Sequence, residues 1–121
     1  MPLQSFKELI VWQRSMELVK EIYRTTSELP QSEMYGIVSQ MRRAAISIAS
    51  NIAEGRHRGT RKDFLQFLRI AYASGAELET QVEISMELGK LNKGEYEEIA
   101  AQVSEIMRML NAMIKKLKVG S

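Results

Sequence analysis

The side chains best suited to chemistry in this sequence are basic and crowded into one short segment. They are Arg56, Arg58, Arg61 and Lys62, in a predicted loop that leads into a helix. Free backbone N–H groups and the helix dipole at such a start already favour anions. Lys62, Gln66 and Arg69 continue the same surface along one side of the helix. The pattern predicts contact with nucleic-acid phosphates, because Lys and Arg contacts release condensed counterions whatever the base sequence.

Two other interpretations of this segment stay open. The cations could simply solubilise the surface, or they could pair with an acidic region of a neighbouring molecule. No Phe, Tyr or Trp interrupts the run from Arg56 to Lys62. Stacking on bases, and with it sequence-selective binding, is therefore not supported.

Three carboxylates, Glu79, Glu83 and Glu87, stand four residues apart on one side of a predicted helix. A di-metal centre in a helical bundle would need Glu-x-x-His pairs, but the chain has one histidine, His57, and no cysteine. We therefore expect no metal. Like charges at this spacing destabilise a helix, so cations of the last helix or of a neighbouring subunit should compensate.

Catalytic patterns are equally weak. A nucleophilic triad would have to join His57 to Asp63 in a surface turn, with no serine placed beside them. Gly55 and Gly59 flank the basic turn without the spacing of a phosphate-binding glycine loop. We expect no enzymatic activity and no cofactor.

Length and composition indicate an ordinary soluble protein. The 121 residues, 45% hydrophobic and 26% charged, suit one domain spanning residues 1–121. The N-terminus lacks the basic and apolar regions of a signal peptide, and no apolar run approaches the roughly 20 residues that cross a bilayer. We expect a cytoplasmic protein that does not enter membranes.

Apolar residues recur at spacings of three and four, which predicts four helices at residues 6–28, 33–54, 61–88 and 93–118. In the first, the predicted core stripe is Leu9, Trp12, Met16, Val19 and Tyr23. Capping patterns begin at Ser5, Thr60 and Asn92, and Gly55 is predicted to end the second helix. Short connections favour an all-α, up-down-up-down antiparallel four-helix bundle.

This topology turns charge blocks along the chain into poles. Residues 42–69 carry a net +5, residues 77–105 a net −6 and residues 106–121 a net +4. One end of the bundle, which we call the basic pole, should gather Lys7, Arg56, His57, Arg58, Arg61, Lys62, Arg69, Lys115, Lys116 and Lys118. The opposite acidic pole should hold Glu28, Glu33, Glu87, Glu95, Glu97 and Glu98, diluted by Lys90 and Lys93. The last three lysines of the basic pole are expected to support the contact made by the arginines.

The second predicted helix carries an unusual polar stripe of Arg43, Ser47, Ser50 and Glu54. Small residues allow close approach of another backbone, and an arginine at one end could fix subunit register. We assign Arg42, Arg43, Ser47, Ser50, Asn51 and Glu54 to subunit contact or packing. The alternative is an ordinary exposed face with weak intrahelical pairs.

Several motifs together resemble the family of small four-helix bundle proteins encoded within 23S rRNA intervening sequences. They are Leu9-Ile10-Val11-Trp12-Gln13, Leu29-Pro30 with Glu33, Tyr35 and Gly36, Arg42-Arg43-Ala44, Ser47-Ile48, Asn51-Ile52-Ala53-Glu54-Gly55, Ile70-Ala71 and Ala76-Glu77-Leu78-Glu79-Thr80. The family is also similar to the accessory variability determinant of diversity-generating retroelements. Two departures are Ala49, where the family often has Pro, and Ala73-Ser74-Gly75, which relocates a small residue of the third helix.

The resemblance implies a four-helix bundle that assembles into a homopentamer, has no known enzymatic activity and is suspected of binding nucleic acid. A ring would set every basic pole on one rim and strengthen a weak contact by avidity. Our first hypothesis is a ring-forming, non-enzymatic protein that binds structured RNA or DNA, without sequence selectivity, through this rim. The second is a protein-interaction scaffold that uses its acidic pole and has no nucleic-acid role.

Overall fold

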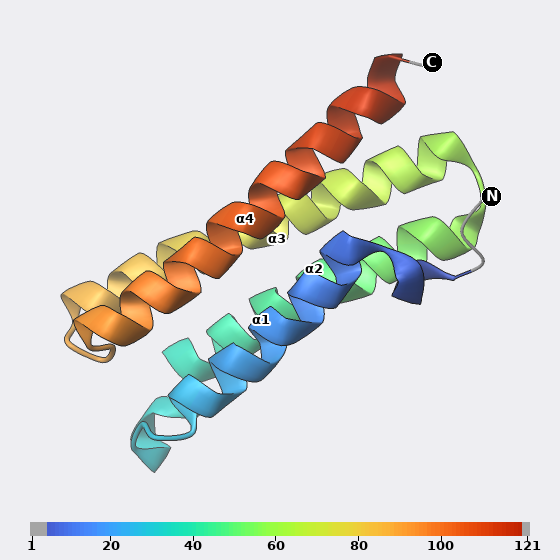
Figure 1. The fold of residues 1–121 in the computed structure, drawn as a ribbon. Coiled ribbons are helices and arrows are strands. Elements are labelled where there is room, and N and C mark those ends of the chain that lie inside the picture. Colours follow the sequence, from blue (N-terminus) through green and yellow to red (C-terminus); the bar gives the residue numbers. More distant parts are fainter. Residues whose placement is uncertain (1–4, 120–121) are drawn as a thin grey trace.

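The computed structural model describes residues 5–119, so the predicted domain of residues 1–121 extends past both ends of this range. The elements are η1 (Phe6–Glu8), α1 (Ile10–Thr26), η2 (Gln31–Glu33), α2 (Ile37–Arg58), α3 (Arg61–Glu87) and α4 (Lys93–Val119). Residues 5–119 contain no strand. Figure 1 shows the four long helices running in alternating directions, with the α2–α3 turn and the end of α4 at the same end of the molecule. The predicted antiparallel four-helix bundle is confirmed.

The first helix begins later than predicted. The Ser5 capping box is present, but it caps the 3-10 turn η1, and Leu9 is extended with φ −73° and ψ 126°. This break folds η1 back, so that the Phe6 ring meets the edge of Trp12 at a centroid distance of 5.2 Å. Consequently α1 starts at Ile10, and the predicted range of 6–28 was too long at both ends.

The core face of α1 also differs from the predicted one. The buried residues are Val11, Ser15, Leu18, Ile22, Thr25 and Thr26, whereas the predicted stripe lies beside them and is only partly covered. The hydroxyl of Ser15 donates to the Val11 carbonyl at 2.7 Å, and that of Thr26 to the Ile22 carbonyl at 2.6 Å. Hydroxyls satisfied in this way can be buried at low cost. Because these residues are polar, the apolar spacing in the sequence pointed to the neighbouring stripe instead.

The second helix ends at Arg58, four residues after its predicted last residue, Glu54. Gly55 remains helical, and α2 continues to Arg58 before Gly59 adopts the left-handed conformation with φ +86°. Gly55 serves close packing instead. A Cβ at this position would lie 2.7 Å from Cβ of Phe67 and 3.2 Å from Cδ1 of Phe64, both in α3. The start also shifts, because η2 occupies residues 31–33 and α2 begins only at Ile37.

The starts of α3 and α4 follow their capping patterns. The Thr60 hydroxyl accepts from the Asp63 N–H at 3.1 Å. At α4, the Asn92 side chain accepts from the Glu95 N–H at 2.8 Å, and the Glu95 carboxylate accepts from the Asn92 N–H at 3.0 Å. Each pattern satisfies backbone donors that have no partner inside the helix.

One core joins the four long helices. Its largest fully buried side chains include Leu18, Ile22, Met41, Ile48, Ile52, Leu68, Leu78, Ile99, Ile106 and Leu110. Gly75 of α3 lies beside Met107 of α4, with only 3.0 Å between a Cβ at Gly75 and the Met107 Cγ. The small residue that departs from the family pattern therefore packs inside the subunit.

We predict that Gly55→Ala destabilises the protein despite the better helix propensity of alanine. The new methyl group meets the rigid base of Phe67 rather than a flexible tip, and overpacking of this kind costs about 1–3 kcal/mol, against a propensity gain of about 1 kcal/mol. Tm from circular dichroism should fall by roughly 5 °C. Gly94→Ala, where the nearest contact is an ordinary 3.4 Å to Asn92 Oδ1, is the control and should leave Tm unchanged or slightly raised. Equal Tm values for the two variants would contradict the packing role.

Candidate nucleic-acid interface

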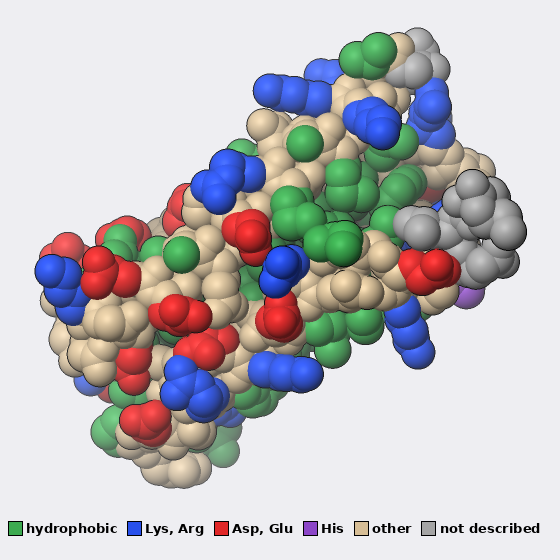
Figure 2. All heavy atoms as spheres, in the orientation of Figure 1, with side chains coloured by type: hydrophobic (Ala, Val, Ile, Leu, Met, Phe, Trp, Pro, Cys, Tyr) green, Lys and Arg blue, Asp and Glu red, His purple; other side chains and the backbone are tan. Residues whose placement is uncertain are grey.

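The predicted basic pole draws on three segments that meet at one end of the bundle. The end of α2, the start of α3 and the end of α4 lie together there (Figure 1). In Figure 2, Lys and Arg side chains gather around the end of α4, while Asp and Glu concentrate toward the opposite end. The antiparallel topology thus brings to one end charges separated by more than sixty residues of sequence.

The arginines before the turn lie in a helix, not in the predicted loop. Arg56 and Arg58 belong to the last turn of α2, because that helix passes Gly55. Cations at a helix C-terminus are favoured by the helix dipole. Arg61 and Lys62, by contrast, are exposed in the first turn of α3, where the dipole disfavours them. Asp63 in the same turn offsets part of this cost.

Arg58 is held by two contacts within the subunit. Its Nε donates to Glu54 Oε2 at 2.9 Å, and its guanidinium lies 5.0 Å from the centroid of the Phe67 ring. Both members of the ion pair are about half exposed, at 51% and 50%. A phosphate at this position would compete with Glu54, whereas Arg61 and Lys62 are open to solvent.

The remaining predicted contact residues lie on α4 and further along α3. Lys115, Lys116 and Lys118 are exposed near the end of α4. Arg69 is exposed more than two turns into α3, on the same side of the helix as Lys62. The interface is therefore a compact α2–α3 cluster flanked by lysines of α4, with Arg69 set further down the bundle.

The acidic pole is partly neutralised. Lys90 Nζ lies 2.7 Å from Glu33 Oε1, so this ion pair joins the α3–α4 connection to η2. Glu95 is engaged in the cap of α4. The molecule keeps a charge separation along its length, since Figure 2 still shows acidic side chains dominating this end.

Several residues assigned to subunit contact or packing are engaged inside the subunit. Arg42 Nε donates to the Thr26 hydroxyl at 3.0 Å, and its guanidinium lies 4.3 Å from the centroid of the Tyr23 ring. This pair of contacts fastens α2 to the end of α1. Arg43 and Ser50 point to solvent.

The predicted polar stripe also reaches into the contact between α2 and α3. The hydroxyls of Ser47 and Ser74 are 2.8 Å apart, and Asn51 Nδ2 donates to the Ser47 carbonyl at 2.8 Å and to its hydroxyl at 3.0 Å. Because α2 packs against α3 on one flank and α1 on the other, residues beside the core stripe are half-buried as well.

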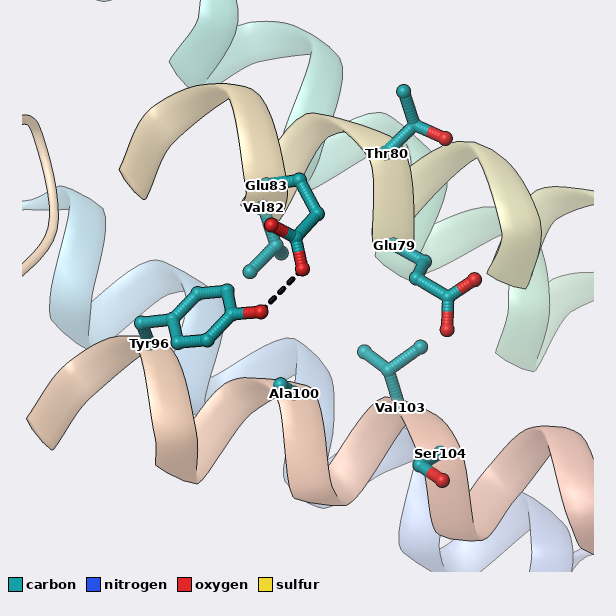
Figure 3. Close-up of a pocket in the computed structure, with 8 residues that line it drawn as sticks. All are labelled: Glu79, Thr80, Val82, Glu83, Tyr96, Ala100, Val103 and Ser104. Carbon is teal, nitrogen blue, oxygen red and sulfur yellow. Dashed lines mark hydrogen bonds between the residues drawn. The ribbon is translucent and has the colours of Figure 1, made fainter. Parts of the chain in front are cut away.

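The carboxylates of α3 line a depression of about 420 Å³ between α3 and α4 (Figure 3). Glu79 and Glu83 stand on one wall, with Val82 and Val103 at the base and Tyr96 across from them. The Tyr96 hydroxyl donates a hydrogen bond to the Glu83 carboxylate. Relief of charge repulsion therefore comes in part from a phenol, whereas the sequence suggested only cations.

Two kinds of feature are absent from residues 5–119. No group of three or more His, Asp or Glu residues is placed to hold a metal ion. None of the helices described is long and apolar enough to cross a membrane.

These features define a class: an all-helical antiparallel bundle with its cations concentrated at one end. The chain belongs to the family of 23S rRNA-intervening sequence proteins, whose family model matches residues 7–112. This confirms the family to which the motifs pointed. The comparisons do not extend to the retroelement proteins.

A solved structure shares the fold along nearly its whole length. It is a protein of unknown function from the S23 ribosomal protein family of Bacteroides thetaiotaomicron, with a TM-score of 0.79 and 27% identity. The similarity covers 88% of this chain and 99% of that chain. Among curated proteins no match was found.

The Tyr96–Glu83 contact yields a pH prediction. The hydrogen bond to the Glu83 carboxylate raises the pKa of the Tyr96 phenol above its usual value of about 10. Its contribution to stability is therefore complete below pH 10 and is lost as the pH rises through the higher folded-state pKa. Ring NMR of carbon-labelled tyrosine should show that Glu83→Gln moves the Tyr96 pKa down. Glu17→Gln, on another face of the bundle, should leave the Tyr96 pKa unchanged. An unchanged Tyr96 pKa in Glu83→Gln would contradict the hydrogen bond between these two residues.

Proposed function

We propose that this protein is a non-enzymatic, ring-forming bundle that binds structured RNA or DNA through phosphate contacts at a basic rim in the cytoplasm. The observation that carries the proposal is the convergence of exposed cations from α2, α3 and α4 on one end of the bundle. The contact residues are Arg56, Arg58, Arg61, Lys62, Arg69, Lys115, Lys116 and Lys118.

The shape of this surface suits a backbone ligand. Apart from Arg69, the cations lie near helix ends at one end of the bundle, so the phosphates of a folded nucleic acid can approach them without entering a cleft. The basic residues from Arg56 to Lys62 are not interleaved with aromatic side chains that would stack on bases. Binding governed by phosphate is salt-dependent and largely independent of sequence.

Cation placement at the start of α3 supports a functional role. Arg61 and Lys62 oppose the helix dipole, which costs some helix stability. Residues that break a local rule without a structural benefit tend to belong to functional sites. An anion bound at this turn would attract Arg61 and Lys62 and would offset their repulsion by the positive end of the α3 dipole.

The family gives the proposal its biological direction. Its name refers to intervening sequences of 23S rRNA, and the solved relative is assigned to a ribosomal protein family. Structured RNA is therefore the first ligand to test. The sequence also resembles retroelement accessory proteins that engage RNA through a basic surface. This resemblance suggests the same kind of ligand.

The test is fluorescence anisotropy of labelled structured RNA and duplex DNA at several salt concentrations. Log affinity should fall linearly with log salt, with a slope of several units. Arg61→Glu/Lys62→Glu should weaken binding at least about tenfold and reduce the slope by about two. These two residues are preferable to Arg58, whose reversal would also break the contact with Glu54.

The matched control is Lys93→Glu/Arg108→Glu, which changes the net charge equally but alters exposed residues away from the basic pole. It should bind nearly as tightly as the wild type. Equal loss in both doubles would indicate a nonspecific charge effect. Absence of binding at low salt would overturn the proposal and favour the scaffold function, in which the acidic pole docks a basic protein.

A further inference from the structure

A shallow apolar groove runs along the outside of α1 and α2. Its lining comes from Trp12, Met16 and Val19 of α1 and from Ile46, Ala49, Ser50 and Ala53 of α2. The groove has a volume of about 290 Å³ and passes at Ile46 into a second hollow lined by Tyr23, Tyr35, Arg42 and Arg43. Ile46 is 41% exposed and Tyr23 40%. Apolar area of this kind on a small protein marks a contact surface.

The groove exists because α1 has more apolar surface than the core uses. Its inner stripe, Val11 to Thr26, is buried, so the neighbouring stripe of Trp12, Met16 and Val19 is left at the edge. Opposite that stripe, α2 offers three small residues, Ala49, Ser50 and Ala53, next to Ile46. The space between the two helices is thus open to a ridge from outside.

A matching ridge lies on α3. Ile70, Ile84 and Leu88 are 40%, 43% and 63% exposed, and Ala73 is exposed between them. Positions 70, 77 and 84 are seven residues apart, the period of a helix that packs lengthwise against another. Glu77 occupies the middle position and is exposed.

We propose that the α3 ridge of one copy docks into the α1–α2 groove of a second copy. This inference rests on the proposed ring and assigns the two faces that build it. The contact is heterologous, with different surfaces on each side, so it can repeat around a closed ring. Pairing two α3 ridges around a two-fold axis would instead bring Glu77 close to Glu77.

Positions along the bundle support the pairing. Arg43 lies fifteen residues before Arg58 and Glu77 sixteen after Arg61, on either side of one turn. At 1.5 Å per residue both are roughly 23 Å from that turn. Copies related by rotation about an axis parallel to the bundle are not shifted along it, so Arg43 of one copy meets Glu77 of the next.

The same alignment matches the apolar residues. Ile70 lies nine residues into α3 and Ala49 nine before the end of α2, so both are roughly 14 Å from the turn. Neither Arg43 nor Glu77 makes an ion pair within residues 5–119. The parallel arrangement also sets every basic pole on the same rim.

The experiment measures the mass of the full-length protein against concentration by light scattering and sedimentation. Arg43→Glu and Glu77→Arg should each raise the apparent dissociation constant at least about fivefold, and the double exchange should restore it. Ala53→Leu, which fills the groove, should also weaken assembly. Ala101→Leu, exposed on α4, is its control, and circular dichroism establishes that every variant is folded.

The outcomes separate this docking from the proposed function. A wild type that stays monomeric at all accessible concentrations overturns both the ring and the docking. If the wild type assembles but Arg43→Glu and Glu77→Arg leave its mass unchanged, the docking alone is overturned. Failure of the double exchange to restore assembly has the same meaning. Tighter association of Glu77→Gln, which removes the repulsion between two facing Glu77 side chains, would identify two-fold pairing of α3 and also overturn the docking.

Discussion

The close contact between α2 and α3 is the constraint on which the rest of the structure depends. It is tightest beside the turn, where Gly55 leaves no room for a Cβ between itself and Phe67. Further along, the Ser47 and Ser74 hydroxyls meet at 2.8 Å. These small residues let the two helices pack closely along their length. The short connections make neighbouring helices antiparallel, which gathers the cations at one end.

The cations around the α2–α3 turn differ in their effect on helix stability. Cations at the end of α2 are stabilised by its dipole, but those at the start of α3 are not. Arg58 is held by Glu54 and by the Phe67 ring, whereas Arg61 and Lys62 extend into solvent. The turn therefore combines one cation that is held within the subunit with two that extend into solvent, an arrangement that suits the phosphate contacts proposed above.

The burial of hydroxyls in α1 has consequences on the outside of the molecule. Because Ser15 and Thr26 return their hydrogen bonds to the helix backbone, they can occupy the core face. The apolar residues beside them, including Trp12 and Met16, then line an external groove. The same local rule that completes the core leaves a second apolar surface for association.

The sequence by itself determined the four helices, their alternating order, the caps at Thr60 and Asn92 and the segregation of charge, because these follow from local spacing and short connections. It also pointed to the family that the comparison confirms. Only the tertiary structure decided which face of α1 is buried, that Gly55 serves close packing rather than ending α2, and that Tyr96 contacts Glu83. Each of these depends on what a neighbouring helix presents at the same height, and the spacing of residues within one helix carries no information about that neighbour.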